Sequence, residues 1–424
     1  MKIDLTALLA ARASTPRRAP VPLDQPWTDP AGYWSTMDAA TAALDPPFAA
    51  AHLGALRHNT HDMLRRASGM PIRVASKSIR SRDLIAGLLA LPGYRGVLAY
   101  TLVEALWLAE TIDDVVVGYP SADRAAIAEL GRSAQLARRV TLMIDSVEQL
   151  DLIDAVLPPE HRETLRVCLE LDSSYKSRLL GHVGVWRSPI RDAPAAVVLA
   201  REVAGRAGFT LVGMMGYEAQ IAGLGNAPAG QPLRAKLLQA IQRASIAELI
   251  ERRSAAVTAV REVADLEFVN GGGTGSLEAT GTDPSVTEVT AGSGLLGPHL
   301  FDNYAHFSPA PAAAFALSVV RRPAPDRVTL LGGGWIASGP PGKDRLPQIA
   351  WPQGLAMIPR EGAGEVQTPV VGAAARTLRV GDRVWLRHTK AGELCEHVHE
   401  LHIVDGDAVV GAALTYRGEG KVFL

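Results

Sequence analysis

The stretch PIRVASKSIRSRDLIAGLLALPGYRGVLAYTLVEALWLAETIDDVVVGY, residues 71–119, alternates two kinds of segment. Short runs of β-branched and small apolar residues have the composition of buried strands. The segments between them, Ser81–Leu91 and Leu102–Glu110, have the apolar spacing of amphipathic helices. The runs are Ile72–Ser76, Gly96–Thr101 and Asp113–Gly118. Strands that alternate with helices in this way predict βαβ units and a parallel sheet.

The same alternation continues to about residue 290. The further runs are Val140–Asp145, Arg166–Asp172, Thr210–Tyr217, Leu266–Asn270 and Val286–Thr290. Eight candidate strands with helical segments between them are what a closed β/α barrel of the TIM type requires. An open, doubly wound sheet is the alternative that the same pattern leaves open.

The pattern changes after residue 310, where strand-like runs follow one another without long helices. Turn signals such as Asp-Gly-Asp at 405–407 separate them, which predicts an antiparallel β domain. We therefore expect three consecutive parts: an N-terminal arm at 1–50 that packs on the β domain, a barrel at 51–310, and the β domain at 311–424.

Bulk composition excludes several classes of function. Lys plus Arg is 43 and Asp plus Glu is 44, so there is no basic surplus for nucleic acid or an anionic membrane. No apolar run is long enough to span a bilayer. Two cysteines, Cys168 and Cys395, give no disulfide framework and suit a reducing cytoplasm, where we expect the protein to act.

Two glycine-rich turns follow the last two candidate strands: GGGTGS at 271–276 and AGSG at 291–294. Such turns expose backbone N–H groups, and β/α barrels often bind a phosphate at the loops after strands seven and eight. The candidate donors are Gly272, Gly273, Thr274, Gly292 and Ser293. Two flexible turns without a ligand are the simpler alternative.

Lys77 directly follows the first candidate strand. A lysine at a barrel mouth can be desolvated, which lowers its pKa and leaves a neutral amine able to form a Schiff base. An ordinary solvated loop lysine is the alternative, and position alone does not decide between them.

The segment Phe268–Ser276 together with TEVTAGS at 287–293 resembles the phosphate-binding elements of the fold-type III pyridoxal 5′-phosphate (PLP) enzymes. The specific likeness is to the D-threonine aldolase and D-serine dehydratase group, relatives of alanine racemase. The Arg73-x-x-x-Lys77 spacing, Glu170-Leu171-Asp172 followed by Arg178, and Gly216-Tyr217 are similar to weaker elements of that group. The likeness extends over about residues 60–310.

The resemblance implies a barrel of the alanine racemase kind in which Lys77 carries PLP. It implies that Arg178 approaches the cofactor ring and that Tyr217 lies near it. The expected activity is that of a lyase on a small β-hydroxy amino acid of D configuration, by aldol cleavage or dehydration. A homodimer is also implied. An amino acid racemase, a non-catalytic PLP-binding protein and a phosphosugar-binding barrel without PLP stay open as alternatives.

The β domain departs from the family pattern. Family lyases hold a divalent ion with a His-x-Cys or His-x-Asp pair, but Lys390 and Gly392 occupy the matching positions. His388, Cys395 and His397 lie in the same stretch, and imidazole and thiolate ligands suit zinc. Manganese is suggested as the ion only by the resemblance. We expect these three to bind a metal if one is present; otherwise His388, Lys390 and Glu393 shape the substrate end of the pocket.

Overall fold

The computed structural model describes residues 5–10, 25–177, 179–340, 342–390 and 392–424. Contacts divide the chain into two compact units. The sheet unit comprises Met1–Asp62, Ser78–Leu91 and Ser293–Val422, and the barrel unit comprises Met63–Lys77, Pro92–Gly292 and Phe423–Leu424. The units interleave along the sequence, whereas we expected three consecutive segments.

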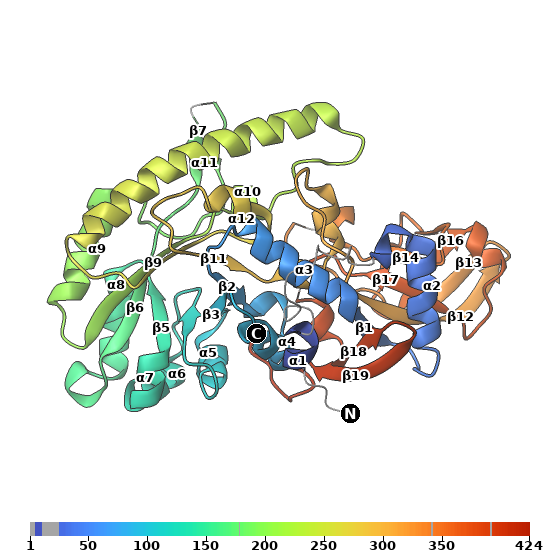
Figure 1. Cartoon of the computed structure of the whole chain (residues 1–424), viewed down its shortest axis with the longest axis horizontal. Helices are drawn as coiled ribbons and strands as arrows, with labels where there is room; N and C mark the ends of the chain where they lie inside the picture. Colours follow the sequence, from blue (N-terminus) through green and yellow to red (C-terminus); the bar gives the residue numbers. More distant parts are fainter. Residues whose placement is uncertain (1–4, 11–24, 178, 341, 391) are drawn as a thin grey trace, which may run out of the picture. The chain divides into compact units, whose positions relative to one another are not determined.

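The barrel unit contains a closed barrel of eight parallel strands (Figure 1). They are β2 (Ile72–Ala75), β3 (Tyr94–Ala99), β4 (Val115–Val117), β5 (Val140–Ile144), β6 (Leu165–Glu170), β9 (Phe209–Gly216), β10 (Phe268–Gly271) and β11 (Glu288–Ala291). The last strand, β11, pairs with the first, β2. Closure confirms the expected barrel, and all eight strands coincide with the runs read from the sequence.

Helices connect the strands of the barrel. They are α5 (Leu102–Leu108), α6 (Arg124–Arg132), α7 (Ala134–Arg139), α8 (Val147–Val156), α9 (Ala193–Gly205), α10 (Ala219–Ala222), α11 (Pro232–Arg261) and α12 (Leu277–Thr280). Side chains at strand ends cap several of them: Thr101 Oγ1 accepts a hydrogen bond from the Glu104 N–H at 3.1 Å and so begins α5. Capping therefore accounts for Thr101, one of the polar residues at the barrel mouth.

A buried ionic network lies inside the barrel. The Arg73 guanidinium donates to Glu288 at 2.6 Å and to Asp114 at 2.8 Å, and Asn270 Nδ2 donates to Glu288 at 2.8 Å. Arg73 is 1% exposed, so these partners satisfy a charge that has no access to water. Arg73 thus joins strands β2 and β11 and has a structural explanation that does not involve Lys77.

The sheet unit is built on a nine-stranded sheet. Its strands are β1 (Phe48–His52), β12 (Ala313–Ala324), β13 (Arg327–Leu331), β14 (Gln348–Trp351), β15 (Leu355–Met357), β16 (Gln367–Gly372), β17 (Arg383–Arg387), β18 (Glu400–Asp405) and β19 (Ala408–Leu414). Neighbours are antiparallel except β1 and β18, which are parallel. Because β1 lies between β12 and β18, the N-terminal part of the chain belongs to this sheet.

Helices α1 (Leu5–Ala10), α2 (Pro30–Ala40) and α4 (Arg82–Leu89) belong to the sheet unit, and α3 (Leu53–Arg66) crosses from one unit to the other. The core of the sheet unit centres on Trp385, which is fully buried against Trp34 and Phe48. Burial of such aromatic side chains supplies much of the apolar area that stabilises a core.

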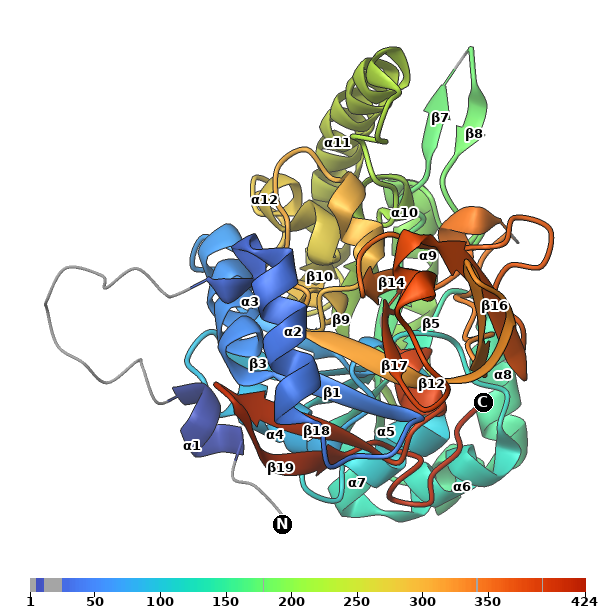
Figure 2. The same ribbon diagram turned by 90° about the vertical axis from the view of Figure 1, so that its right-hand side faces the viewer.

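A two-stranded hairpin, β7 (Tyr175–Ser177) and β8 (Gly181–Val183), lies between β6 and α9. Figure 2 shows this hairpin and the N-terminal end of α11 projecting from the barrel. Among the described helices, none is both long and apolar enough to cross a membrane.

Candidate active site

Lys77 and Tyr119 meet at the end of the barrel where the strands have their carboxyl termini. Lys77 lies in the 3-10 turn Ser76–Ser78 after β2, and Tyr119 lies two residues beyond β4. The Lys77 Nζ atom donates a hydrogen bond to the Tyr119 hydroxyl oxygen at 2.9 Å. Strand β3 separates β2 from β4, so the two side chains reach across the end of an intervening strand.

Arg187 lies against the faces of two tyrosines. Its Cζ atom is 5.2 Å from the centre of the Tyr119 ring and 4.8 Å from the centre of the Tyr217 ring. A guanidinium over an aromatic face at this range is attracted by the ring quadrupole. The Arg187 Nη1 atom also lies 3.6 Å from the Glu170 Oε1 atom, and the Glu170 side chain is 3% exposed. A chain of contacts thus leads from Lys77 to Tyr119, from Tyr119 to Arg187, and from Arg187 to Glu170 and Tyr217.

The environment of Glu170 favours its neutral form. Burial raises the pKa of this carboxyl to about 7, even though the Arg187 charge acts in the opposite direction. Burial also raises the pKa of Tyr217, to about 12. Groups with pKa values shifted by burial and specific charges are typical of functional sites.

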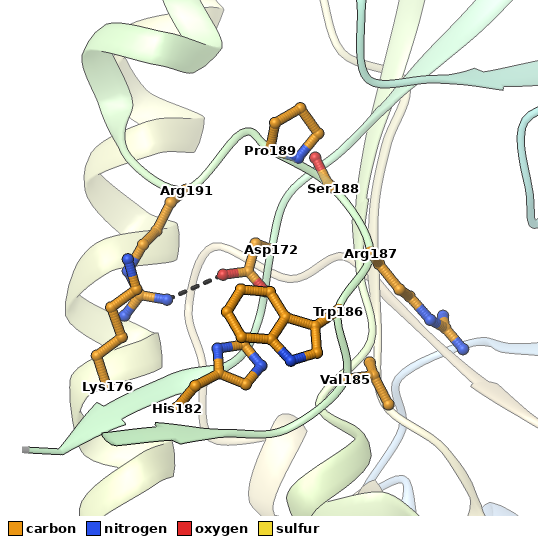
Figure 3. A pocket seen from close by; sticks show the side chains of 9 residues that line it. All are labelled: Asp172, Lys176, His182, Val185, Trp186, Arg187, Ser188, Pro189 and Arg191. Carbon is orange, nitrogen blue, oxygen red and sulfur yellow. Dashed lines mark hydrogen bonds and ion pairs between the residues drawn. The ribbon is translucent and has the colours of Figure 1, made fainter.

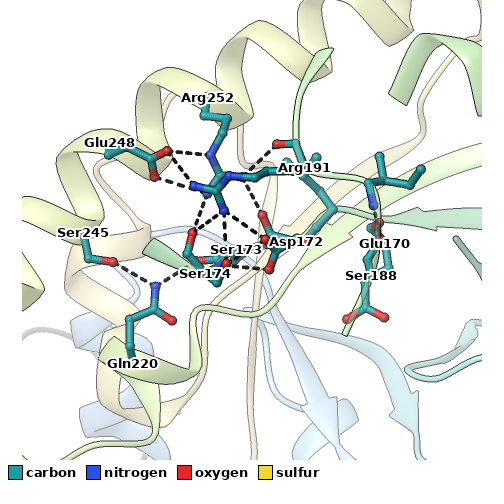
Figure 4. Close-up of polar contacts among 12 residues, drawn as sticks. Glu170, Asp172, Ser173, Ser174, Ser188, Arg191, Gln220, Ser245, Glu248 and Arg252 are labelled. Carbon is teal, nitrogen blue, oxygen red and sulfur yellow. Dashed lines mark hydrogen bonds and ion pairs between the residues drawn. The ribbon is translucent and has the colours of Figure 1, made fainter. Parts of the chain in front are cut away.

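The loop that carries Arg187 is tied down at its two ends (Figure 4). Asp172 accepts a hydrogen bond from Arg191 at 2.9 Å, and Arg252 of α11 donates to the Asp172 carbonyl at 2.5 Å and to the Arg191 carbonyl at 2.9 Å. Burial opposes ionisation of Asp172, but hydrogen bonds from Ser174 and Arg191 outweigh it and lower its pKa. These contacts make the base of the loop a fixed support for Arg187.

Residues of the same loop line a small open pocket of about 250 Å³. The rings of His182 and Trp186 stack there, with centroids 3.8 Å apart and planes 8° from parallel. Figure 3 shows the Arg187 side chain pointing away from this stacked pair. The loop therefore presents an aromatic surface on one side and a cation on the other.

Arg178, the arginine expected at the cofactor ring, lies outside the described residues. The cation that the structure brings to Tyr119 and Tyr217 is Arg187, nine residues further along the chain. Sequence reasoning missed it because the hairpin between Asp172 and Arg187 sets which residue returns to the barrel mouth. Tyr119 was missed as well, although its place directly after a strand was a usable signal.

Hydrogen bonds from its own N–H groups fix the first glycine-rich turn, residues 271–276. Gly272 has φ +84°, and its N–H donates to the buried Glu218 carboxylate at 3.1 Å. The Gly273 N–H donates to Ser276 Oγ at 3.1 Å. These bonds fix the turn, and they also engage two of the N–H groups expected to bind phosphate.

A Cβ atom at Gly273 in this turn, or at Gly292, would lie too close to its neighbours. A Cβ on Gly273 would lie 2.9 Å from Ala222 Cβ and 3.2 Å from Tyr217 Cε2. A Cβ on Gly292 would lie 2.5 Å from the Ala75 carbonyl oxygen, two residues before Lys77. The turns therefore approach Tyr217 and the Lys77 strand closely. Thr274 begins the 3-10 turn Thr274–Ser276, and Ser293 begins the 3-10 turn Ser293–Leu295.

The stretch expected to hold a metal has different chemistry. Burial lowers the pKa of His388 to about 3 and raises the pKa of Cys395 to about 12, which keeps its thiol protonated. His397 packs face to face on Trp335 at 4.7 Å. Within the described part of the chain, no three His, Cys, Asp or Glu side chains are grouped so as to bind a metal. Because the described donors of this stretch are not brought together, this donor set does not fit a metal site.

Lys390 and Glu393 are connected through the backbone. The Lys390 N–H donates to Glu393 Oε1 at 2.6 Å, and Lys390 Nζ lies 3.4 Å from the Ser338 carbonyl oxygen. Burial raises the pKa of Glu393 to about 7. These two residues thus form a local polar cluster in the sheet unit.

Known proteins share this architecture. A D-threonine aldolase from Arthrobacter sp. is 25% identical over 303 residues, which cover 69% of this chain and 72% of that protein. The crystal structure of D-threonine aldolase from Filomicrobium marinum matches with a TM-score of 0.73 at 18% identity, over 90% of this chain and 97% of that one. D-threo-3-hydroxyaspartate dehydratase from Delftia sp. HT23 matches with a TM-score of 0.67 at 19% identity, over 89% and 98%.

These structural likenesses support the barrel and the sheet described above. The model of the alanine racemase N-terminal domain matches residues 51–295, which is more than half of the sequence. The chain belongs to the alanine racemase N-terminal domain family.

Proposed function

We propose that this protein is a PLP-dependent lyase that acts on a small β-hydroxy amino acid of D configuration. The observation that carries the proposal is the Lys77 amine at the barrel mouth, hydrogen-bonded to Tyr119, whose ring also contacts the Arg187 cation. The relatives support the substrate class, since a D-threonine aldolase and a D-threo-3-hydroxyaspartate dehydratase are named for D-amino acids with a β-hydroxyl group.

The residues present fit PLP. The Lys77 amine would bond to the cofactor aldehyde, and the turns of Gly273, Thr274, Gly292 and Ser293 would hold its phosphate, since a side chain at Gly273 or Gly292 would fill that space. When bound, PLP acts as an electron sink for the substrate's α-carbon.

The chain's own residues would then direct the reaction. Lys77 would accept or return a proton at Nζ. Arg187 would supply positive charge beside the two tyrosine rings, the role that we first expected of Arg178. Tyr217 would pack against the bound group, because its half-buried ring lies beside the Gly273 turn. We further propose cytoplasmic action, which suits two buried free cysteines, and a homodimer.

A substrate panel tests the proposal. The purified protein should absorb visible light as a PLP protein does, and borohydride reduction followed by peptide mapping should label Lys77. D-threonine, D-serine, D-phenylserine and D-3-hydroxyaspartate should be compared with their L isomers for release of aldehyde or keto acid. We expect release from D isomers only, and none from Lys77→Met. A label on another lysine, or bound PLP without turnover of any member, would contradict the lyase assignment, and interconversion of D and L isomers would identify a racemase.

A further inference from the structure

Tyr119 contacts two cations, Lys77 and Arg187. The Lys77 Nζ atom donates to its hydroxyl oxygen at 2.9 Å and lies 5.5 Å from its ring centre. The Arg187 Cζ atom lies 5.2 Å from the same ring centre. A phenol oxygen that receives a hydrogen bond from an ammonium group is stabilised in its ionised form.

The charges on Tyr119 do not all act in one direction. Burial and the Glu170 carboxylate oppose ionisation of the phenol, whereas Lys77 and Arg187 favour it. The balance lowers the pKa of Tyr119 below its ordinary value of 10.0.

Tyr217 provides an internal comparison. It has the same Arg187 cation at 4.8 Å from its ring centre, and the structure gives it no hydrogen bond to Lys77. Its pKa is raised to about 12, chiefly by burial. The two tyrosines share Arg187 and differ in the bond to Lys77 and in depth of burial, so the bond to Lys77 is one of two features that set Tyr119 apart.

We propose that Tyr119 is a second acid–base residue of this site and exchanges a proton with Lys77 along the hydrogen bond between Nζ and Oη. The role rests on the proposed function. Transfer from the Lys77 ammonium to the Tyr119 phenolate gives a neutral amine and a neutral phenol, so one proton moves and the net charge stays constant. The reverse transfer restores the ammonium. Lys77 can then take a proton from the substrate repeatedly without releasing it directly to water.

A residue that only packed beside Lys77 would behave differently. Phenylalanine keeps the ring, its contact with Arg187 and nearly all of the volume, and removes only the oxygen. Tyr119→Phe therefore separates proton exchange from packing. Tyr175→Phe, on the hairpin strand β7, is the matched control, because it makes the same change within the same unit.

The first measurement needs neither cofactor nor turnover. The full chain without PLP is titrated with base, and tyrosinate formation is followed by near-ultraviolet absorbance. One tyrosine should ionise below the ordinary range near pH ~10. This early ionisation should disappear in Tyr119→Phe, persist in Tyr175→Phe, and move to higher pH in Lys77→Met, where the cation is gone. Ordinary titration of every tyrosine in the native chain, or an early ionisation that survives in Tyr119→Phe, would overturn the pairing.

The second measurement uses the holoenzyme and the substrate that the panel identifies. Tyr119→Phe should lower kcat by about 10²–10⁴-fold, the usual contribution of acid–base catalysis, with little change in KM and with altered pH dependence of kcat. Unchanged kcat and pH profile would refute the catalytic role. If the chain binds no PLP, the proposed function fails, whereas the titration still supports or overturns the Lys77–Tyr119 pair.

Discussion

At the scale of single residues, Glu170 is a buried acid whose ionisation is unfavourable. Its side chain is 3% exposed, and burial raises its pKa to about 7 from an ordinary value of 4.5. A carboxyl with a raised pKa binds a proton more tightly in the folded chain than in the unfolded chain. Its contribution to stability is therefore present below about pH 4.5 and is lost as the pH rises through 7.

Glu170→Gln should show this linkage. Glutamine stays neutral at every pH. The free energy of unfolding of the variant should therefore exceed that of the native protein by up to about 3 kcal/mol at pH 8, and this difference should vanish near pH 4. The variant also loses the ion pair between Glu170 and Arg187, and this loss will reduce the gain in the free energy of unfolding. Urea unfolding at the two pH values measures it, with the exposed Glu129→Gln as control. A gain that is equal at both pH values would mean that Glu170 ionises normally.

At the scale of elements, the barrel strands were accessible from sequence and parts of the sheet were not. Val115–Val117 and Val140–Ile144 are β-branched runs bounded by helices, and the structure confirms them as β4 and β5. Phe48–His52 has the sequence FAAAH, with no β-branched residue, yet it forms β1 because it pairs with β12 and β18. Tertiary pairing overrode local propensity there.

The residues of the candidate site also differ in whether their positions could be predicted from the sequence. Lys77 and the glycine-rich turns follow strands directly, so their positions could be predicted from strand ends alone. Arg187 could not, because its position depends on how the β7–β8 hairpin folds and on the Asp172–Arg191–Arg252 contacts at the base of the loop. The resemblance implied Arg178, which lies outside the described residues, and these contacts bring Arg187 to the tyrosine rings.

The turn after β10 gives a test at this scale. Gly273→Val should weaken PLP binding at least about tenfold, because a Cβ there lies 2.9 Å from Ala222 and 3.2 Å from Tyr217, and the turn must shift. Gly205→Ala is the control, since a Cβ there has no heavy atom within 4 Å. Titration of the PLP-free protein with PLP gives the two dissociation constants. Normal binding by Gly273→Val would locate the phosphate elsewhere.

At the scale of the whole molecule, the chain passes between its two units at the residues that we assign to the site. It leaves the barrel unit directly after Lys77 and again directly after Gly292. Lys77 and Gly292 are also close in the barrel, because Gly292 approaches Ala75 and β11 pairs with β2. The proposed cofactor contacts thus coincide with the ends of two barrel segments.

The sheet unit decides whether the protein needs a metal. The residues that we expected to bind one are His388, Cys395 and His397, and the Cys395 thiol is buried with its pKa raised to about 12. Among the described residues these donors do not form a group of three, and His397 is already stacked on Trp335. Lys390, at the position of a family ligand, would add a positive charge that repels a dication.

We therefore predict that activity is independent of a divalent metal. Dialysis against a chelator should leave kcat unchanged, and elemental analysis should give substoichiometric zinc and manganese. Cys395→Ser should keep the same chelator-insensitive activity, because the buried thiol would have no metal to hold. Stoichiometric metal in the native protein, with activity lost to the chelator and restored by zinc or manganese, would contradict the prediction. Loss of that metal in Cys395→Ser or His397→Ala would then identify its ligands. This outcome would also require the described donors of the sheet unit to move together, since they are not grouped as a metal site.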